Sequence, residues 1–221
     1  MLSRSAKATF YVLAGPLMKL NGALYRRFRV PNRGEIKVHL GPGQKNYLDG
    51  WVNVDANMFS GKCDVWVDLR NPLPFHPGTV DAVYSHHVIE HLPNIECHLR
   101  DVYRCLRPGG VYRLGGPNGD SAIEKFAKNE AQWFSDFPEK RKSIGGRFEN
   151  FIFCRGEHLT ILTYSYLEEL MAKIGFIDLR LCKPATESYH PELFQECLLK
   201  EYESDYDVPH TLIVEGVKPR L

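Results

Sequence analysis

The residues best suited to chemistry lie where strand-like runs end. Asp55 and Asp68 close the runs WVNVD and DVWVDL, and the glycine-containing loop Gly41–Gly43 follows the run IKVHL. Two glycines allow a tight turn and a close backbone approach to an anionic group. A strand-end carboxylate can accept hydrogen bonds from both hydroxyls of a ribose, while Asp68 and Leu69 suit an adenine amino group and ring. These residues together predict a nucleoside-binding sheet edge.

A fourth run, Val80–Ser85, leads into a histidine-rich segment. His87-x-x-Glu90-His91 matches the H-x-x-E-H pattern, in which two histidines on one helical face bind zinc. The segment follows a strand directly, Pro93 shortens any helical turn, and no acidic ligand follows downstream. We therefore expect Glu90 and His91 to bond to each other or to nearby backbone. A zinc peptidase remains a disfavoured alternative, and no metal ligands are assigned.

Short strand-like runs alternate with helical ones that must position these residues. Ile95, Leu99 and Val102 form an apolar helical stripe, a capping box at Ser165 opens a second helix, and a third is expected over 121–133. This alternation predicts a doubly wound α/β fold with a seven-stranded, mostly parallel sheet. The expected strands are Ile36–Leu40, Trp51–Asp55, Asp64–Leu69, Val80–Ser85, Gly110–Leu114, Phe176–Cys182 and Thr211–Val217.

Composition excludes several classes of protein. The 221 residues carry 28 Lys and Arg against 27 Asp and Glu, so the net charge is +1, without the basic surplus of a nucleic-acid reader. Six cysteines without C-x-x-C spacing argue against a zinc ribbon or thioredoxin-like site and fit reduced thiols in the cytoplasm. We expect an N-terminal helical segment over 1–33 and one domain over 34–221, with an insertion after the fifth strand.

The apolar run Phe10–Met18 lies between basic residues. Arg4 and Lys7 precede it and Lys19 follows it. A bilayer crossing takes about 20 apolar residues, so this run is too short. It also lacks the small-residue cleavage site of a signal peptide. We predict an amphipathic helix that covers the core or a second copy of the chain, with contact to a membrane surface as the alternative.

Five segments follow one another in a characteristic order: VHLGPG, GWVNVD, DLRNPLPF, VDAVYSHHVIEHL and LRPGGVYRL. This order resembles the class I S-adenosylmethionine (SAM)-dependent methyltransferases, and among them a bacterial, glycan-associated branch with a short connection between the first two strands. The resemblance covers residues 35–118 and, more loosely, Gly156–Phe176 and Thr211–Lys218. It implies a Rossmann-like fold, SAM as cofactor and a methyl-transfer reaction.

The resemblance also implies which residues contact the cofactor. The loop after the first strand would hold the methionine part of SAM, although Pro42 departs from the family pattern and removes one backbone amide there. The acids that end the second and third strands would bind the ribose and the adenine. The implied cofactor-binding residues are Leu40, Gly41, Pro42, Gly43, Asp55, Asp68, Leu69, Ser85 and His86.

Methyl transfer to a hydroxyl requires a group that removes its proton, and histidine titrates near neutral pH. His158 follows the insertion, where relatives of this branch also carry a histidine. We predict that His158 is the general base and that Glu157 or His86 orients it or the acceptor; a purely structural His158 is the alternative. His76 and His98 are expected at the surface. A divalent-cation (Mg²⁺) requirement is not readable from the sequence.

Aromatic and polar side chains in and after the insertion suit a sugar, because rings cover its apolar face and polar groups bond its hydroxyls. The run GGRFENFIFCRGEHLTILT is also similar to mycobacterial-type 1-O-methyltransferases that act on short methylated mannosides. We expect an O-methyltransferase with a mannoside or oligosaccharide acceptor. An N-methyltransferase and a non-catalytic SAM-binding protein are the alternatives. The candidate acceptor-binding residues are Asn118, Asp120, Trp133, Arg147, Tyr164 and Tyr189.

Overall fold

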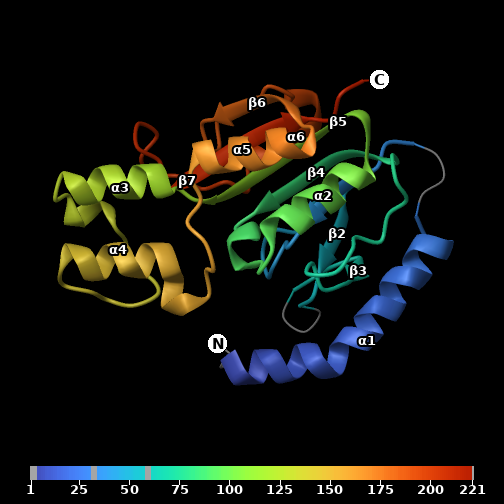
Figure 1. The fold of residues 1–221 in the computed structure, drawn as a ribbon, viewed down its shortest axis with the longest axis horizontal. Coiled ribbons are helices and arrows are strands. Elements are labelled where there is room, and N and C mark those ends of the chain that lie inside the picture. Colours follow the sequence, from blue (N-terminus) through green and yellow to red (C-terminus); the bar gives the residue numbers. More distant parts are fainter. Residues whose placement is uncertain (1–3, 31–33, 58–60, 221) are drawn as a thin grey trace.

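A seven-stranded sheet forms the centre of the protein (Figure 1). The structure is a computed structural model that describes residues 4–30, 34–57 and 61–220. Its strands are β1 (Lys37–Leu40), β2 (Val52–Asp55), β3 (Val65–Trp66), β4 (Val80–His86), β5 (Leu106–Pro117), β6 (Ile177–Cys182) and β7 (Thr211–Val217). The order across the sheet is β3-β2-β1-β4-β5-β7-β6, and only the pairings of β7 are antiparallel. The predicted fold class is confirmed.

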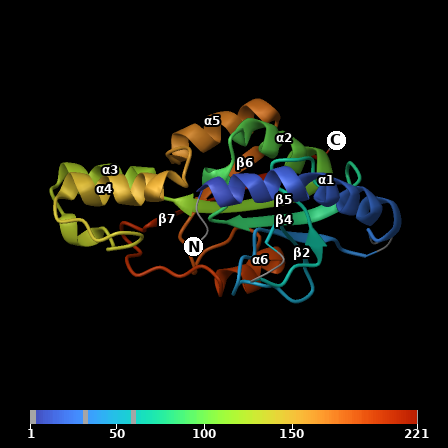
Figure 2. The same ribbon diagram turned by 90° about the horizontal axis from the view of Figure 1, so that it is seen from below.

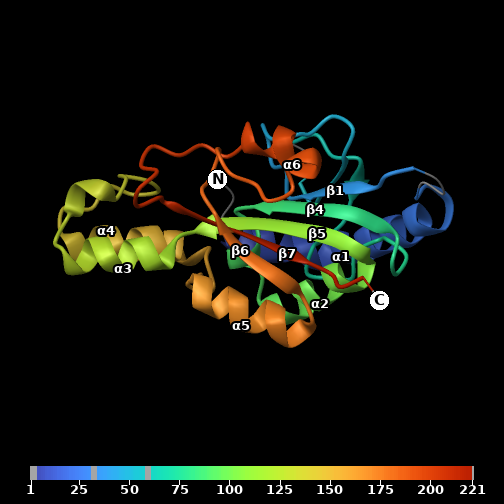
Figure 3. The ribbon, with the colours of Figure 1, turned by 90° about the horizontal axis from the view of Figure 1, so that it is seen from above.

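Helices cover the two faces of the sheet unequally (Figures 2 and 3). α2 (Ile95–Cys105) and α5 (Tyr164–Ile174) pack on one face and bury Leu99 and Leu167 in the main core. α6 (Pro191–Leu198) lies on the other face, where Phe194 packs beside Trp51 at a ring separation of 6.1 Å. The parallel strands β1 and β2 are joined by residues 41–51 without a helix, which is the short connection expected from the resemblance.

The predicted N-terminal amphipathic helix is present as α1 (Arg4–Phe28), which packs beside β3. Ala14 and Met18 are buried against Ala56, and Tyr25 meets the ring of Phe75. Such burial of one apolar stripe holds a surface helix on its domain. Within the described ranges, none of the helices combines the length and hydropathy that a bilayer crossing requires.

Two strands, β3 and β5, differ from their predicted bounds by more than one residue at an end. β3 has two residues rather than six, because Asp68 turns the chain: its carboxylate accepts a hydrogen bond from the backbone amide of Arg70 at 3.0 Å. β5 begins at Leu106, four residues earlier than predicted. A register shift opposite β4 lets Leu106 pair with Val80, so a segment with the composition of a turn is taken into the strand.

Helical segments also differ. The helix predicted over 121–133 is split into α3 (Gly119–Ala127) and the 3-10 turn η2 (Ala131–Trp133), because Asn129 adopts a left-handed conformation. Thr163, not Ser165, caps α5: its hydroxyl accepts from the amide of Tyr166. His98 is buried rather than at the surface, because it lies on the inner side of α2.

The insertion forms a helical hairpin beyond the end of β5 (Figures 1 and 3). α3 packs against α4 (Ile144–Phe153), a helix that the sequence analysis did not predict. Trp133, Phe134 and Ile152 form its small core. The hairpin is thus a separately packed unit that leads the chain back to the sheet at Glu157 and His158.

Candidate functional site

The loop after β1 turns tightly at Gly41 and approaches the segment that follows β4. Gly41 has φ +69°, and a Cβ atom at this position would lie 2.5 Å from Cγ2 of Val88. Its amide donates to the carbonyl of Val54 in β2 at 2.9 Å. Glycine is required here because a side chain would be both strained and obstructed. The glycine loop and the end of β4 are therefore in direct contact.

Asp55 links this loop to the tip of β2. Its carboxylate accepts hydrogen bonds from the amides of Gly43 at 2.9 Å and Asn57 at 2.8 Å, one on each oxygen. A carboxylate oxygen has a second lone pair, so both oxygens retain capacity for a ligand hydroxyl. Gly61 is a loop residue that sequence reasoning missed: a Cβ there would lie 2.2 Å from the carbonyl oxygen of Gly43. The position assigned to the ribose acid fits a diol ligand.

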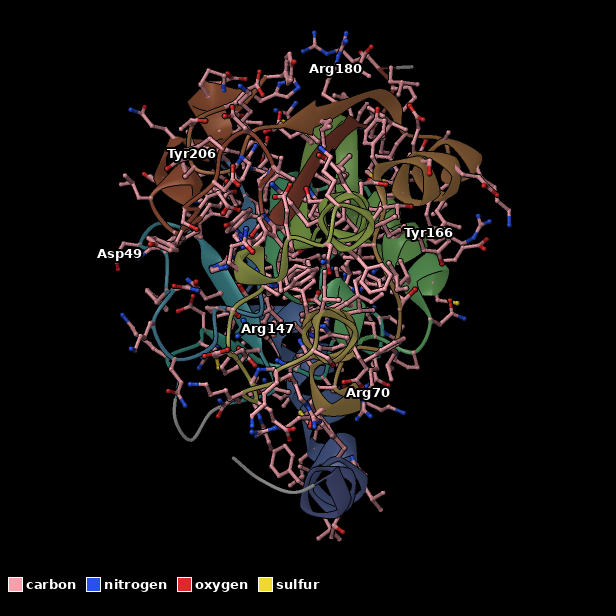
Figure 4. All side chains as sticks on the ribbon, turned by 90° about the vertical axis from the view of Figure 1, so that its left-hand side faces the viewer. Asp49, Arg70, Arg147, Tyr166, Arg180 and Tyr206 are labelled. Carbon is pink, nitrogen blue, oxygen red and sulfur yellow. The ribbon has the colours of Figure 1, made fainter. Side chains whose placement is uncertain are left out.

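Asp68 is engaged by a neighbouring cation. Arg70 donates from Nε and Nη2 to the two carboxylate oxygens at 2.9 and 2.7 Å. The guanidinium lies 3.8 Å from the ring centre of Tyr11, so α1 covers this pair, and Figure 4 shows Arg70 directly beside that helix. Leu69 lines a cavity of about 350 Å³ together with Leu92. The adenine role of Asp68 and Leu69 stays a prediction.

The remaining predicted cofactor contacts lie in or beside the sheet. Leu40 and Pro42 are buried. The Ser85 hydroxyl pairs with that of Tyr112 at 2.8 Å, and Ser85 is paired with β1 and β5 on its two sides, so its cofactor role stays a prediction. His86 is half-buried, and its Nε2 has no hydrogen-bond partner among the described residues. Burial, with smaller effects of nearby cationic groups, lowers the pKa of His86 well below its usual value, so the ring is neutral at pH 7.

The structure brings His158 to the end of β4. Cys154 and Arg155 have positive φ values of 44° and 59° and turn the chain after α4. His91 Nδ1 then donates to the carbonyl of Glu157 at 3.0 Å, and the His91 and His158 rings are 4.8 Å apart. The predicted base, which is remote in sequence, therefore lies beside the H-x-x-E-H segment.

We call Glu90, His91 and His158 the Glu90 cluster. Glu90 is fully buried, and His87 Nδ1 donates to its Oε1 at 3.1 Å. Burial opposes ionisation, but the His87 hydrogen bond and the adjacent imidazoles hold the pKa of Glu90 below its usual value. The expectation of backbone bonding is confirmed for His91, whereas Glu90 bonds to His87 instead.

His158 has one ring nitrogen committed to the protein. Its Nδ1 donates to the carbonyl of Ile152 at 2.9 Å. A carbonyl only accepts, so the proton of the neutral ring resides on Nδ1 and Nε2 carries a lone pair. Burial lowers the pKa of His158 despite the nearby Glu90 carboxylate. The ring can accept a proton or bind a metal ion through Nε2.

Three of the six predicted acceptor residues make hydrogen bonds that stabilise the fold. Asn118 caps α3 by accepting from the amide of Ser121, and Asp120 accepts from the amide of Tyr164 at 2.8 Å. The Tyr164 hydroxyl donates to Glu168. These contacts hold the two ends of the insertion and leave an acceptor role for these residues as a prediction.

The other three do not gather at one place. Trp133 is buried in the hairpin, and Arg147 pairs with Asp136 at 2.9 Å. Tyr189 lies in the segment before α6, with the guanidinium of Arg180 5.5 Å from its ring centre. Figure 4 shows Arg147 and Arg180 at well-separated places. Residue type alone did not reveal that Tyr189 is on a different part of the molecule.

Comparison with known proteins places this geometry in a known fold. Residues 56–114, from the end of β2 to β5, match the family described as a methyltransferase domain. A crystal structure of a SAM-dependent methyltransferase from Thermotoga maritima, described as a possible histamine N-methyltransferase, matches with a TM-score of 0.52 at 17% identity, over 97% of this chain and 96% of that one. The chain has the class I methyltransferase fold. A search of curated proteins finds no match.

Two further structures with this methyltransferase fold differ in the atom that they methylate. Phosphoethanolamine N-methyltransferase 2 of Haemonchus contortus, in complex with SAM, has a TM-score of 0.50 at 18% identity, over 91% of this chain and 52% of that one. The CurJ carbon methyltransferase has a TM-score of 0.51 at 13% identity, over 98% and 56%. The family match and the fold support a SAM-dependent methyltransferase, and they do not select the acceptor atom.

Proposed function

We propose that the protein transfers the methyl group of SAM to a hydroxyl of a small polyhydroxylated acceptor, with a mannoside or oligosaccharide as the favoured class. The observation that carries the proposal is the close approach of Gly41 to Val88. Val88 precedes Glu90 by two residues in the sequence, so this approach holds the glycine loop near Glu90. Asp55 would hold the ribose hydroxyls at the same edge. A proton-accepting cluster beside the cofactor loop is what a hydroxyl acceptor requires.

The reaction needs one displacement and one proton transfer. A lone pair of the acceptor oxygen attacks the methyl carbon, the carbon–sulfur bond breaks, and its electron pair stays on sulfur to give S-adenosylhomocysteine. The hydroxyl proton passes to Nε2 of His158, whose other nitrogen is fixed by Ile152. Positioned base catalysis contributes about 10²–10⁴-fold, and alignment of the reactants supplies much of the rest.

A single segment of the sequence supports a sugar as the acceptor. Residues 145–163 resemble methyltransferases that act on short methylated mannosides, and this segment ends beside the Glu90 cluster. The second candidate is N-methylation, because the Thermotoga and Haemonchus structures are described as N-methyltransferases. An amine acceptor that is neutral needs no strong base, so dependence on His158 discriminates between the two.

A radiolabelled-SAM assay with mannosides, small alcohols and amines tests this proposal. We expect transfer to a hydroxyl, and we expect His158→Gln to lower turnover about 100-fold while affinity for S-adenosylhomocysteine is retained. His76→Gln, an exposed histidine elsewhere, is the matched control. Methylation of amines alone would contradict the proposal. Cofactor binding without transfer to any acceptor would indicate a non-catalytic SAM-binding protein.

We also propose that the outward face of α1 contacts an anionic membrane surface. Leu13, Leu17 and Leu20 are 72%, 59% and 56% exposed on this face, and the exposed Arg26 and Arg27 follow at its end. An apolar stripe beside cations suits a lipid surface with anionic headgroups.

None of the six cysteines, all within the described ranges, forms a disulfide, which is compatible with the expected cytoplasmic location.

A further inference from the structure

We propose that the Glu90 cluster is a binding site for a divalent transition-metal ion. Glu90, His91 and His158 each offer one ligand atom, and these atoms all lie within 4.8 Å of one another. They come from segments on either side of the insertion, which the hydrogen bond from His91 Nδ1 to the carbonyl of Glu157 ties together. Metal binding itself does not depend on the proposed function; its role in methyl transfer does.

Both imidazoles are arranged as metal ligands usually are. His91 donates through Nδ1 to Glu157 and His158 donates through Nδ1 to Ile152, in each case to a backbone carbonyl. Ligating histidines commonly donate their second N–H to a carbonyl or carboxylate, which fixes the ring and its tautomer. In the neutral tautomer that these hydrogen bonds select, each ring presents Nε2 with its lone pair. His91 Nε2 lies 3.9 Å from Oε1 of Glu90, so it faces the carboxylate.

The Glu90 side chain is the second, independent observation. It is fully buried, and its Oε2 has no hydrogen-bond partner in the described part of the chain. A buried carboxylate with an unpaired oxygen is costly unless a cation compensates it. His87 already donates to Oε1, as hydrogen bonds to ligating carboxylates commonly do. A metal ion would give the unpartnered Oε2 of Glu90 a ligand bond.

The donor set selects the class of ion. Two imidazole nitrogens and one carboxylate oxygen suit Zn²⁺, Mn²⁺, Co²⁺ or Fe²⁺, whereas Mg²⁺ and Ca²⁺ prefer oxygen ligands alone. Ligand atoms around a tetrahedral Zn²⁺ lie roughly 3.4 Å apart, given bond lengths of about 2.1 Å. The most widely separated ligand atoms, up to 4.8 Å apart, thus need to approach one another by about 1.4 Å on binding, through small side-chain movements that keep the Nδ1 hydrogen bonds. Three protein ligands leave at least one position open.

An open position gives the ion a part in the proposed reaction. A hydroxyl oxygen bound there would lose its proton to solvent water more readily, because a divalent ion lowers the pKa of a coordinated hydroxyl or water. His158 Nε2 cannot bind the metal and accept the proton at the same time. If the ion is present during turnover, His158 is a ligand and not the base. The two roles are therefore distinguishable by measurement.

Co²⁺ titration of the chelator-treated 221-residue chain tests the site directly. We expect one ion per chain with the absorption bands of low-coordinate Co²⁺, displaced by Zn²⁺ and not by Mg²⁺. His158→Gln should weaken Co²⁺ binding by at least about 100-fold, because it removes a ligand rather than a supporting group. Glu90→Gln should do the same. His76→Gln is the control, and thermal melting with S-adenosylhomocysteine binding verifies folding.

The outcomes separate this proposal from the proposed function. Absence of one-to-one Co²⁺ binding, or binding equal in His158→Gln and the control, would overturn the metal site. Undiminished methyl transfer by the chelator-treated protein, with no ion bound, would overturn the ion's part in the reaction and would leave the base role of His158 standing. Co²⁺ binding that depends on the cluster, without transfer to any hydroxyl, would keep the metal site and reject the proposed function.

Discussion

Asp55 has a structural role and, in the proposed function, a binding role as well. It already accepts from the amides of Gly43 and Asn57, and it would accept two more hydrogen bonds from a ribose. We expect Asp55→Ala to lower affinity for S-adenosylhomocysteine by at least about 100-fold, since hydrogen bonds to charged groups contribute about 1.5–3 kcal/mol each. Isothermal titration calorimetry measures this. Asp49→Ala, an exposed acid in the preceding loop, is the control, and equal affinities in the two variants would remove the ribose assignment.

Arg113 is a residue that stabilises the fold through buried ion pairs. It is fully buried in β5 and donates to Glu201 at 2.7 and 2.8 Å and to Glu215 at 2.6 Å. The surrounding carboxylates outweigh the desolvation of the guanidinium, so the pKa of Arg113 is raised. Arg113→Met would leave two buried carboxylates without their cation and should destabilise the fold by about 3–5 kcal/mol in urea unfolding. Arg100→Met, which removes an exposed ion pair with Glu96, should have a much smaller effect.

At the scale of elements, α1 has an inner face that the domain covers and an outer face that it leaves to solvent. We expect the Leu17→Glu, Leu20→Glu double variant to lose most of its binding to vesicles of anionic phospholipid, because two charges interrupt the apolar stripe. Flotation with the vesicles measures the bound fraction. Leu199→Glu changes a leucine that is 86% exposed away from α1 and serves as the control. A dimer that dissociates on the same double substitution would make this stripe a subunit contact instead.

The sequence predicted the bounds of an element well where its residues are apolar and buried along its length. Thr211–Val217 is buried along nearly its whole length, and its predicted bounds agree with β7. α6 was missed because it has only eight residues and buries two of them, Phe194 and Cys197, which gives too little periodicity. β3 was overextended because an edge strand has one neighbour, and the Asp68 turn ended it early.

At the scale of the whole molecule, the sheet topology predicted which strand-end residues of the candidate site lie together. It did not predict the approach of His158 to them. Parallel strands bring Gly41, Asp55 and the end of β4 to one edge, so local patterns located them. The approach of His158 to His91 depends on the path of a helical hairpin, and 66 residues separate His91 from Glu157. Sequence spacing carries no information about such a contact. The H-x-x-E-H segment was the available signal, although its partner lay in the insertion.

His210 fastens that hairpin to the sheet and makes the attachment sensitive to pH. It lies next to β7, its ring stacks on Trp133 at 4.1 Å, Nε2 donates to the Trp133 carbonyl, and Nδ1 donates to Glu203. Both nitrogens thus carry protons. Burial opposes the charge, but the Glu203 and Trp133 hydrogen bonds outweigh it, with a smaller contribution from the charge of Asp205, so the pKa of His210 is raised above 6.5.

A raised folded-state pKa means that the folded protein binds the proton more tightly than the unfolded chain. The stabilisation is complete below about pH 6.5 and is lost as the pH rises through the folded-state pKa. We expect the free energy of unfolding of the wild type to fall relative to His210→Gln between pH 6 and 9, by at most about 1.4 kcal/mol per pH unit. Glu203 has a lowered pKa and stays ionised throughout this range. Urea unfolding with His76→Gln as control measures the difference, and parallel curves for the wild type and His210→Gln would show that folding does not raise the pKa of this histidine.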